Sequence, residues 1–221
     1  IHLPLPETPE GQIALTASGQ LHAAAGKSAA LAIGPGLGNV ESIRGLMQSL
    51  FLTEPYLETP SVIDADALNA LSQAYRWWES LKALAVLTPH PGEMGRLLDK
   101  TVPQVQENRV EITQRASVQW AQVVVLKGAH TVIASPDGRT TVSPFANPAL
   151  ATAGTGDVLT GIIGALLAQG LAPYDAARLG VYVHAAAAER VSRRVGSSGL
   201  LASDLHAEIP LVMDRLRYTP T

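Results

Sequence analysis

Short apolar runs alternate with longer amphipathic segments through the first half of the chain. Consecutive apolar residues indicate strands buried on both faces, whereas apolar residues spaced three or four apart indicate helices that bury one side. This alternation is typical of an α/β domain with a parallel sheet covered by crossover helices. The expected strands span residues 29–33, 62–63, 84–87 and 123–126, and the expected helices between them span 40–52, 67–74 and 109–119.

The second half of the chain begins with a different pattern and then becomes helical. Pro136, Asp137 and Gly138 form a turn signal between residues 131–134 and 140–143, which predicts a β-hairpin. No internal repeat, low-complexity tract or linker divides the sequence, so residues 1–221 are predicted to form a single domain. The remaining helices are expected at residues 157–169, 174–195 and 203–217.

Composition narrows the classes of protein that fit this pattern. Of the 221 residues, 47% are hydrophobic and 16% are charged, which suits a sheet buried on both faces. A formal net charge of −3 and no basic stripe argue against a nucleic-acid partner. The absence of cysteine excludes disulfides, thiolate metal sites and a cysteine nucleophile. No apolar run is long enough for a membrane span and the first residues do not resemble a signal peptide, so a cytoplasmic protein without a membrane partner is expected.

The segment at residues 147–170, NPALATAGTGDVLTGIIGALLAQG, is the most informative in the chain. Small residues at Ala153, Gly154 and Gly156 precede an apolar helix, whose first amides have no partner within the helix. Such a turn can hold an anion, and Asp157 beside it can take a proton from a hydroxyl while the amides hold a phosphoryl group. The alternative is a glycine turn whose acidic residue only stabilises the helix N-terminus.

Further candidate residues follow the predicted strands, where open α/β sheets bind their ligands. The glycine-rich loop 34–38 allows close backbone approach, although it can equally be an ordinary strand–helix turn. Asp64 and Asp66 could hold a Mg²⁺–phosphate complex through water, whereas Asp66 could instead be a helix N-cap. His90 lies between two prolines that restrict its backbone, and Lys127 ends a strand where a cation suits a polyphosphate. Each could also be structural or merely solvated.

Five segments together, in this order, resemble the ribokinase-like superfamily and within it the ADP- or ATP-dependent NAD(P)H-hydrate dehydratases. The resemblance implies a three-layer α/β sandwich with a mostly parallel central sheet flanked by helices. The segments are AIGPGLG at 32–38, VIDADALNAL at 62–71, LTPHPGEMGRLL at 87–98, VVVLKGAHTVIASPDG at 123–138, and residues 147–170.

The resemblance implies a reaction that repairs NADH or NADPH hydrated on the nicotinamide ring, in its S epimer. ADP or ATP is the implied co-substrate and Mg²⁺ the implied cofactor, and the enzyme is a lyase. Asp157 would deprotonate the ring hydroxyl, which takes the terminal phosphoryl group before phosphate is eliminated. The implied substrate contacts are Gly38, His90 and Asp157; the nucleotide contacts are Lys127, Gly128, Ala129, His130, Thr131 and Gly156; and the anion hole comprises Ala153, Gly154, Thr155 and Gly156.

Two further expectations concern the whole protein. Members of this family carry an additional strand–loop–helix portion before the segment that the first ten residues resemble, so part of the sheet and of the substrate site is expected to lie upstream. The resembled enzymes are commonly assemblies, which predicts a homo-oligomer.

Two other functions remain open on the residues alone. A kinase of the same fold would phosphorylate a vitamin precursor or sugar hydroxyl and stop there, because it needs the same base and anion-binding turn. A nucleotide-binding protein without turnover is the second alternative.

Overall fold

The central element is a mostly parallel sheet, which confirms the predicted fold class. The computed structural model describes residues 2–196 and 198–218. Within them, six strands pair in the order β1-β2-β3-β4-β5-β6. The first four are parallel, and β5 and β6 form the predicted antiparallel hairpin. The strands are β1 (Leu31–Ile33), β2 (Ser61–Ile63), β3 (Ala85–Leu87), β4 (Val123–Leu126), β5 (Val132–Ala134) and β6 (Thr140–Val142).

The sheet has two buried faces because neighbouring residues of a strand point in opposite directions. In β2, Val62 packs with one hydrophobic cluster and Ile63 with another, and both side chains are fully buried. Val86 and Leu87 of β3 divide between the same two clusters. Each continuous apolar strand therefore contributes side chains to the hydrophobic clusters on both faces of the sheet.

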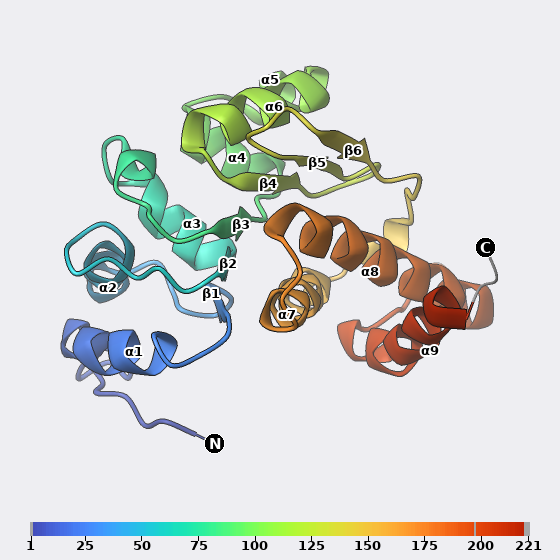
Figure 1. The fold of residues 1–221 in the computed structure, drawn as a ribbon. Helices are drawn as coiled ribbons and strands as arrows, with labels where there is room; N and C mark the ends of the chain where they lie inside the picture. Colours follow the sequence, from blue (N-terminus) through green and yellow to red (C-terminus); the bar gives the residue numbers. More distant parts are fainter. Residues whose placement is uncertain (1, 197, 219–221) are drawn as a thin grey trace.

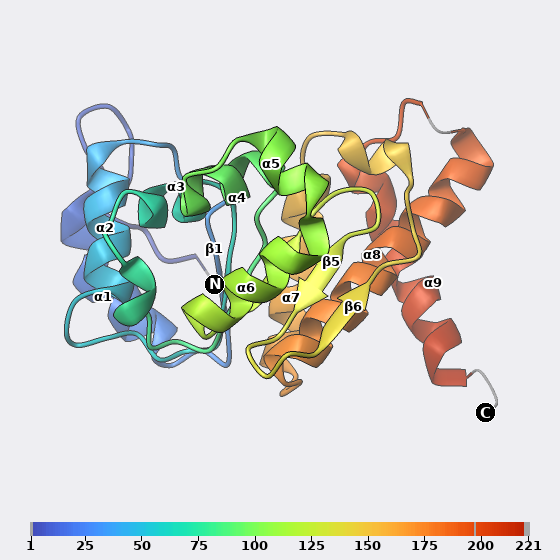
Figure 2. The ribbon, with the colours of Figure 1, turned by 90° about the horizontal axis from the view of Figure 1, so that it is seen from above.

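Helices cover each face of the sheet (Figure 1). One layer packs α2, α3, α4 and α6 on the sheet, and the other packs α7 and α8, with α9 behind α8. Figure 2 shows the same separation from above. The helices are α1 (Ser18–Ala25), α2 (Glu41–Phe51), α3 (Ala65–Ser72), α4 (Pro91–Leu98), α5 (Val102–Glu107), α6 (Arg109–Trp120), α7 (Thr155–Ala168), α8 (Pro173–Val195) and α9 (Leu205–Tyr218).

The differences from the predicted elements lie mainly at helix ends. Helix α3 starts at Ala65, two residues before the expected start, so Asp64 rather than Asp66 occupies the N-cap position. Helix α7 starts at Thr155 because Gly154 takes the left-handed conformation that begins the turn. Helices α1 and α5 were not predicted, since neither carries a long periodic apolar stripe.

Candidate active site

The carboxyl ends of β1 to β4 point toward one edge of the sheet, and the predicted polar residues follow these ends. The loop 34–38 follows β1, Asp64 follows β2, His90 comes three residues after β3, and Lys127 follows β4. Parallel pairing brings these positions together although they are far apart in sequence. The first turn of α7 reaches the same edge, because a Cβ atom at Gly156 would lie 3.6 Å from Lys127 Nζ.

The glycine-rich loop after β1 is fixed to the strand beside it. Gly34 has a φ of +133°, and a Cβ atom there would overlap the carbonyl oxygen of Asp64, so only glycine fits. At the other end of the loop, the amide of Gly38 donates a hydrogen bond of 2.8 Å to Asp66 Oδ2. Asp66 therefore holds the predicted substrate loop and does not cap α3.

His90 caps helix α4. Its Nδ1 atom accepts hydrogen bonds from the amides of Gly92 (2.9 Å) and Glu93 (3.3 Å), while Glu93 Oε2 accepts one from the His90 amide (2.7 Å). Burial lowers the pKa of His90; the Glu93 carboxylate opposes that shift, and the positive charge of Lys127 adds to it. The imidazole side chain is half-exposed, so it combines a capping role with access to a ligand.

Lys127 lies in a group of buried charges that the sequence did not predict. Its Nζ atom donates to Asp64 Oδ1 at 2.5 Å and lies 3.8 Å from Glu93 Oε2. The second oxygen of Asp64 accepts a hydrogen bond of 2.7 Å from the hydroxyl of Thr160 on α7. Side-chain exposure is 1% for Asp64 and 19% for Lys127, so most of this pair is removed from water.

The loop 128–131, which follows Lys127, is held in an unusual conformation. Gly128 and His130 both have positive φ values, of 135° and 52°. Thr131 donates to the Gly128 carbonyl at 2.9 Å, and Arg109 donates to the carbonyls of Leu126 (3.0 Å) and Lys127 (3.3 Å). Arg109 was missed at the sequence level because only the fold brings α6 beside the end of β4.

The same loop lines a cavity of about 360 Å³ with the segment before α7 and with part of α8. Gly128, Ala129 and Thr131 contribute to its wall, together with Ala151 and His184. His184 lies on α8 and is buried. The imidazole is 7% exposed, its Nε2 atom has no hydrogen-bond partner, and burial lowers the pKa to about 4, so it is neutral at pH 7.

Helix α7 begins at a glycine turn, as predicted. Gly154 has a φ of +85° and precedes the first helical residue. The Thr155 hydroxyl donates to the carbonyls of Leu150 (2.7 Å) and Thr152 (2.8 Å), which fixes the turn. An α-helix leaves its first amides without partners inside the helix, so the turn that includes Ala153 and Gly156 can receive an anion.

Asp157 follows Gly156 in the first turn of α7, and its side chain is exposed. It lines a largely apolar cavity of about 690 Å³ between α7 and α9, with Val158, Ile162 and Met213 among the other lining residues. In the described part of the chain its carboxylate has no hydrogen bond or ion pair. An unpaired, exposed carboxylate beside an anion-binding turn can accept a proton from a bound hydroxyl.

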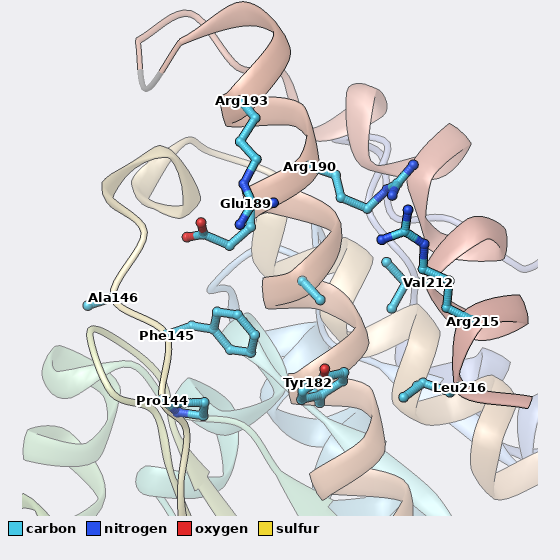
Figure 3. A pocket seen from close by; sticks show the side chains of 11 residues that line it. Pro144, Phe145, Ala146, Tyr182, Glu189, Arg190, Arg193, Val212, Arg215 and Leu216 are labelled. Atoms are coloured by element: carbon cyan, nitrogen blue, oxygen red, sulfur yellow. The ribbon is translucent and has the colours of Figure 1, made fainter. Parts of the chain in front are cut away.

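Three arginines line a second pocket, away from the site residues described above. Arg190, Arg193 and Arg215 line a pocket of about 550 Å³ with Phe145 and Tyr182, between the segment after β6 and helices α8 and α9 (Figure 3). None of the site residues predicted from the sequence lines it. Arg190 pairs with Glu208 at 2.6 Å, so part of this charge already stabilises the α8–α9 contact.

Asp64 and Asp66, the predicted metal-binding candidates, are already hydrogen-bonded to other protein groups. Both oxygens of Asp64 and one oxygen of Asp66 accept hydrogen bonds from the protein. Among the described residues, no group of three or more His, Asp or Glu side chains is placed to hold a metal ion. Asp64 and Asp66 are thus bonded within the protein, and no three-residue cluster accompanies them in the described part of the chain.

No helix in the described ranges is both long and apolar enough to cross a lipid bilayer.

The layered sheet and the glycine turn before α7 define a ribokinase-like domain. A ribokinase-like superfamily protein from Enterococcus faecalis superposes with a TM-score of 0.73 at 24% identity, over 90% of this chain and 68% of that chain. More specifically, the profile of the NAD(P)H-hydrate dehydratase family matches residues 4–211. The chain belongs to the NAD(P)H-hydrate dehydratase family.

Individual relatives agree with this assignment. The bifunctional NAD(P)H-hydrate repair enzyme Nnr of Moorella thermoacetica is 45% identical over 212 residues, which are 96% of this chain and 39% of that protein. The ADP-dependent (S)-NAD(P)H-hydrate dehydratase of Neisseria meningitidis is 44% identical over 177 residues, covering 78% of this chain and 59% of that protein. The ADP/ATP-dependent dehydratase of Bacillus subtilis has a TM-score of 0.75 and 36% identity, over 88% of this chain and 71% of that chain. The chain therefore spans less than two thirds of the M. thermoacetica and N. meningitidis proteins.

Proposed function

We propose that this chain carries the catalytic site for ADP- or ATP-dependent dehydration of hydrated NADH or NADPH, in the S form. The observation that carries the proposal is the first turn of α7, where an unpaired Asp157 follows Gly156 and the fixed ammonium of Lys127 lies beside Gly156. The names of the relatives from N. meningitidis and B. subtilis support this substrate and these nucleotides.

In the proposed reaction, Asp157 removes the proton from the ring hydroxyl, whose oxygen forms a bond to the terminal phosphorus of the nucleotide. The bond between that phosphorus and the bridging oxygen of the nucleotide breaks, and the leaving group is AMP when the donor is ADP or ADP when the donor is ATP. Ala153, Gly154, Thr155 and Gly156 offer the turn that receives the transferring phosphoryl group. The ring nitrogen then expels phosphate as the carbon–oxygen bond breaks, and loss of a proton from the neighbouring carbon restores NAD(P)H.

The two ligands are proposed to meet at this turn. Lys127, Gly128, Ala129, His130 and Thr131 hold the nucleotide, and the cavity beside this loop supports that placement. Gly38 and His90, at the ends of β1 and β3, contact the hydrated dinucleotide together with Asp157.

Mg²⁺ is proposed to enter with the nucleotide, held by its phosphates and by water, because Asp64 and Asp66 are already bonded within the protein. When bound it would neutralise phosphate charge. The proposed location is the cytoplasm, where this substrate and these nucleotides are available, and the predicted homo-oligomer stays a prediction.

The proposal is tested by mixing the purified protein with hydrated NADH and either ADP or ATP. Absorbance at the reduced-nicotinamide wavelength should rise only when hydrated NADH and a nucleotide are both present, with one phosphate released per NADH formed. Nucleotide consumption with a stable phosphorylated product and no rise in absorbance would indicate a kinase. Nucleotide binding without consumption would indicate a protein without turnover.

A further inference from the structure

Asp64 is among the most enclosed charged residues in the described chain, with a side chain that is 1% exposed. Its two carboxylate oxygens have separate partners: Oδ1 accepts from Lys127 at 2.5 Å and Oδ2 from Thr160 at 2.7 Å. Its backbone is also constrained, because the Gly34 backbone packs directly on its carbonyl group. Asp64 is therefore held by three elements: the loop after β1 constrains its backbone, and the end of β4 and helix α7 fix its carboxylate.

This fixed carboxylate determines where the Lys127 ammonium lies. Asp64 holds Nζ beneath the first turn of α7, where a Cβ atom at Gly156 would lie 3.6 Å from Nζ and 3.9 Å from Asp64 Oδ2. Glu93, at 3.8 Å, is a second carboxylate near the ammonium, but it is mainly bonded to the amide of His90. Asp64 is thus the partner that sets the position of the lysine.

Burying such an ion pair is not an efficient way to stabilise a fold, because desolvation offsets much of the attraction between the charges. A group of well-packed apolar side chains could fill the same space. A catalytic site gains from the arrangement, however, since a preorganised cation stabilises developing charge without reorganising during the reaction.

We propose that Asp64 is a positioning residue, which fixes the Lys127 ammonium against the anion-binding turn, and that Thr160 holds Asp64 in that orientation. This inference rests on the proposed function for its catalytic consequence but not for its geometry. It also gives Asp64 a task other than ligating Mg²⁺.

The geometric part can be tested without measuring activity. An amine-reactive reagent labels Lys127 faster when the side chain leaves the ion pair and becomes fully exposed to solvent. Labelling of Lys127, measured by mass spectrometry relative to the exposed Lys27 in the same sample, should become several-fold faster in Asp64→Asn than in the wild type. Equal relative rates in the two proteins would overturn the proposal.

The catalytic part is tested by steady-state kinetics and nucleotide binding on the same variant. Asp64→Asn should lower kcat by about 10- to 100-fold, because the ammonium no longer points at the transferring group, and should weaken nucleotide binding by no more than Lys127→Ala does. A tenfold rise in the Mg²⁺ concentration needed for half-maximal activity, with unchanged Lys127 labelling, would show that Asp64 is a metal ligand and would overturn the proposal.

Thr160 provides a second variant that keeps every charge and guards against misfolding of Asp64→Asn. Thr160→Val removes only the hydroxyl and should speed labelling of Lys127 and lower kcat, both to a smaller degree than Asp64→Asn. Thr160→Ser keeps the hydroxyl and should restore both values toward the wild type. If Val and Ser behave alike, Thr160 does not orient Asp64. If the wild type shows no dehydration but the labelling order holds, the proposed function fails and the positioning role stands.

Discussion

The two sides of the first turn of α7 differ sharply. On the sheet side, Lys127 and Asp64 form a buried ion pair whose atoms are fixed by β2, β4 and α7. On the outer side, the Asp157 carboxylate is exposed at the mouth of a largely apolar cavity and has no partner in the described part of the chain. The Asp64 carboxylate is therefore buried and hydrogen-bonded, whereas the Asp157 carboxylate is exposed and has no protein partner in the described part of the chain.

This difference separates the two tasks of phosphoryl transfer. A group that stabilises charge works best when it cannot move, whereas a base must keep its lone pairs free until the substrate arrives. Asp64 accepts a hydrogen bond on each of its two oxygens, from Lys127 and from Thr160. Asp157 accepts none in the described part of the chain, and this difference is why Asp157 is the proposed base.

The largest expected effect follows from removing the free carboxylate. Asp157→Asn keeps the shape of the side chain but cannot take a proton, so kcat should fall by roughly two to four orders of magnitude with little change in nucleotide affinity. Asp175→Asn, at an exposed carboxylate on α8, is the matched control and should leave kcat unchanged. Retention of more than about a tenth of wild-type turnover by Asp157→Asn would mean that Asp157 is not the base.

The buried His184 should make the free energy of unfolding depend on pH under acidic conditions. Because its folded-state pKa, about 4, is below the ordinary value of 6.5, its contribution to stability is complete above pH 6.5. That contribution is lost as the pH falls toward 4, since the unfolded chain then binds a proton that the folded chain does not. The loss amounts to about 3 kcal/mol.

The measurement is chemical denaturation at pH values between 4 and 7. His184→Gln cannot titrate, so its stability should depend less on pH over this window by about the same 3 kcal/mol. His2→Gln, at an exposed residue, controls for the loss of a histidine. Parallel stability curves for His184→Gln and the wild type would contradict the expectation.

Lys127→Ala tests whether the Lys127 ammonium contacts the nucleotide. Loss of a charge-assisted contact should raise the KM for the nucleotide by roughly 10- to 100-fold, and by much less for the hydrated dinucleotide. The exposed Lys27→Ala should change neither constant. Equal, small increases for both substrates in Lys127→Ala would indicate a lysine that does not contact the nucleotide.

The smallest expected effect concerns the turn between the two regions. A Cβ atom at Gly156 would meet no protein atom closer than 3.6 Å, so Gly156→Ala should fold normally. Its methyl group would nevertheless enter the space where the phosphoryl group must approach, and the nucleotide KM should rise by about tenfold. The rise should occur with an unchanged melting temperature, and an unchanged KM would place the phosphates elsewhere.

The sheet and its order of elements could be predicted because continuous apolar runs and helical periodicity can be recognised within short stretches of sequence. The sequence also placed the candidate residues at strand ends, from which parallel pairing could be expected to bring them together. The hairpin at residues 131–143 followed from the turn residues 136–138.

The partners within the site could not be predicted in this way. Asp64 and Lys127 are 63 residues apart, and Thr160 lies a further 33 residues along the chain, so no local pattern connects them. Arg109 and His184 likewise gain their positions only from helix packing. A polar residue on the sheet-facing side of α7, such as Thr160, is the one local signal that could have pointed to a buried contact.

The most direct test of the central claim is the fate of the ring oxygen. Hydrated NADH carrying ¹⁸O in its ring hydroxyl should deliver that oxygen to the released phosphate, because the hydroxyl attacks phosphorus before the carbon–oxygen bond breaks. Mass spectrometry of the phosphate should find one ¹⁸O atom per molecule of NADH restored, with either ADP or ATP as the phosphoryl donor. Unlabelled phosphate, with the ¹⁸O released as water, would contradict transfer of the phosphoryl group to the ring.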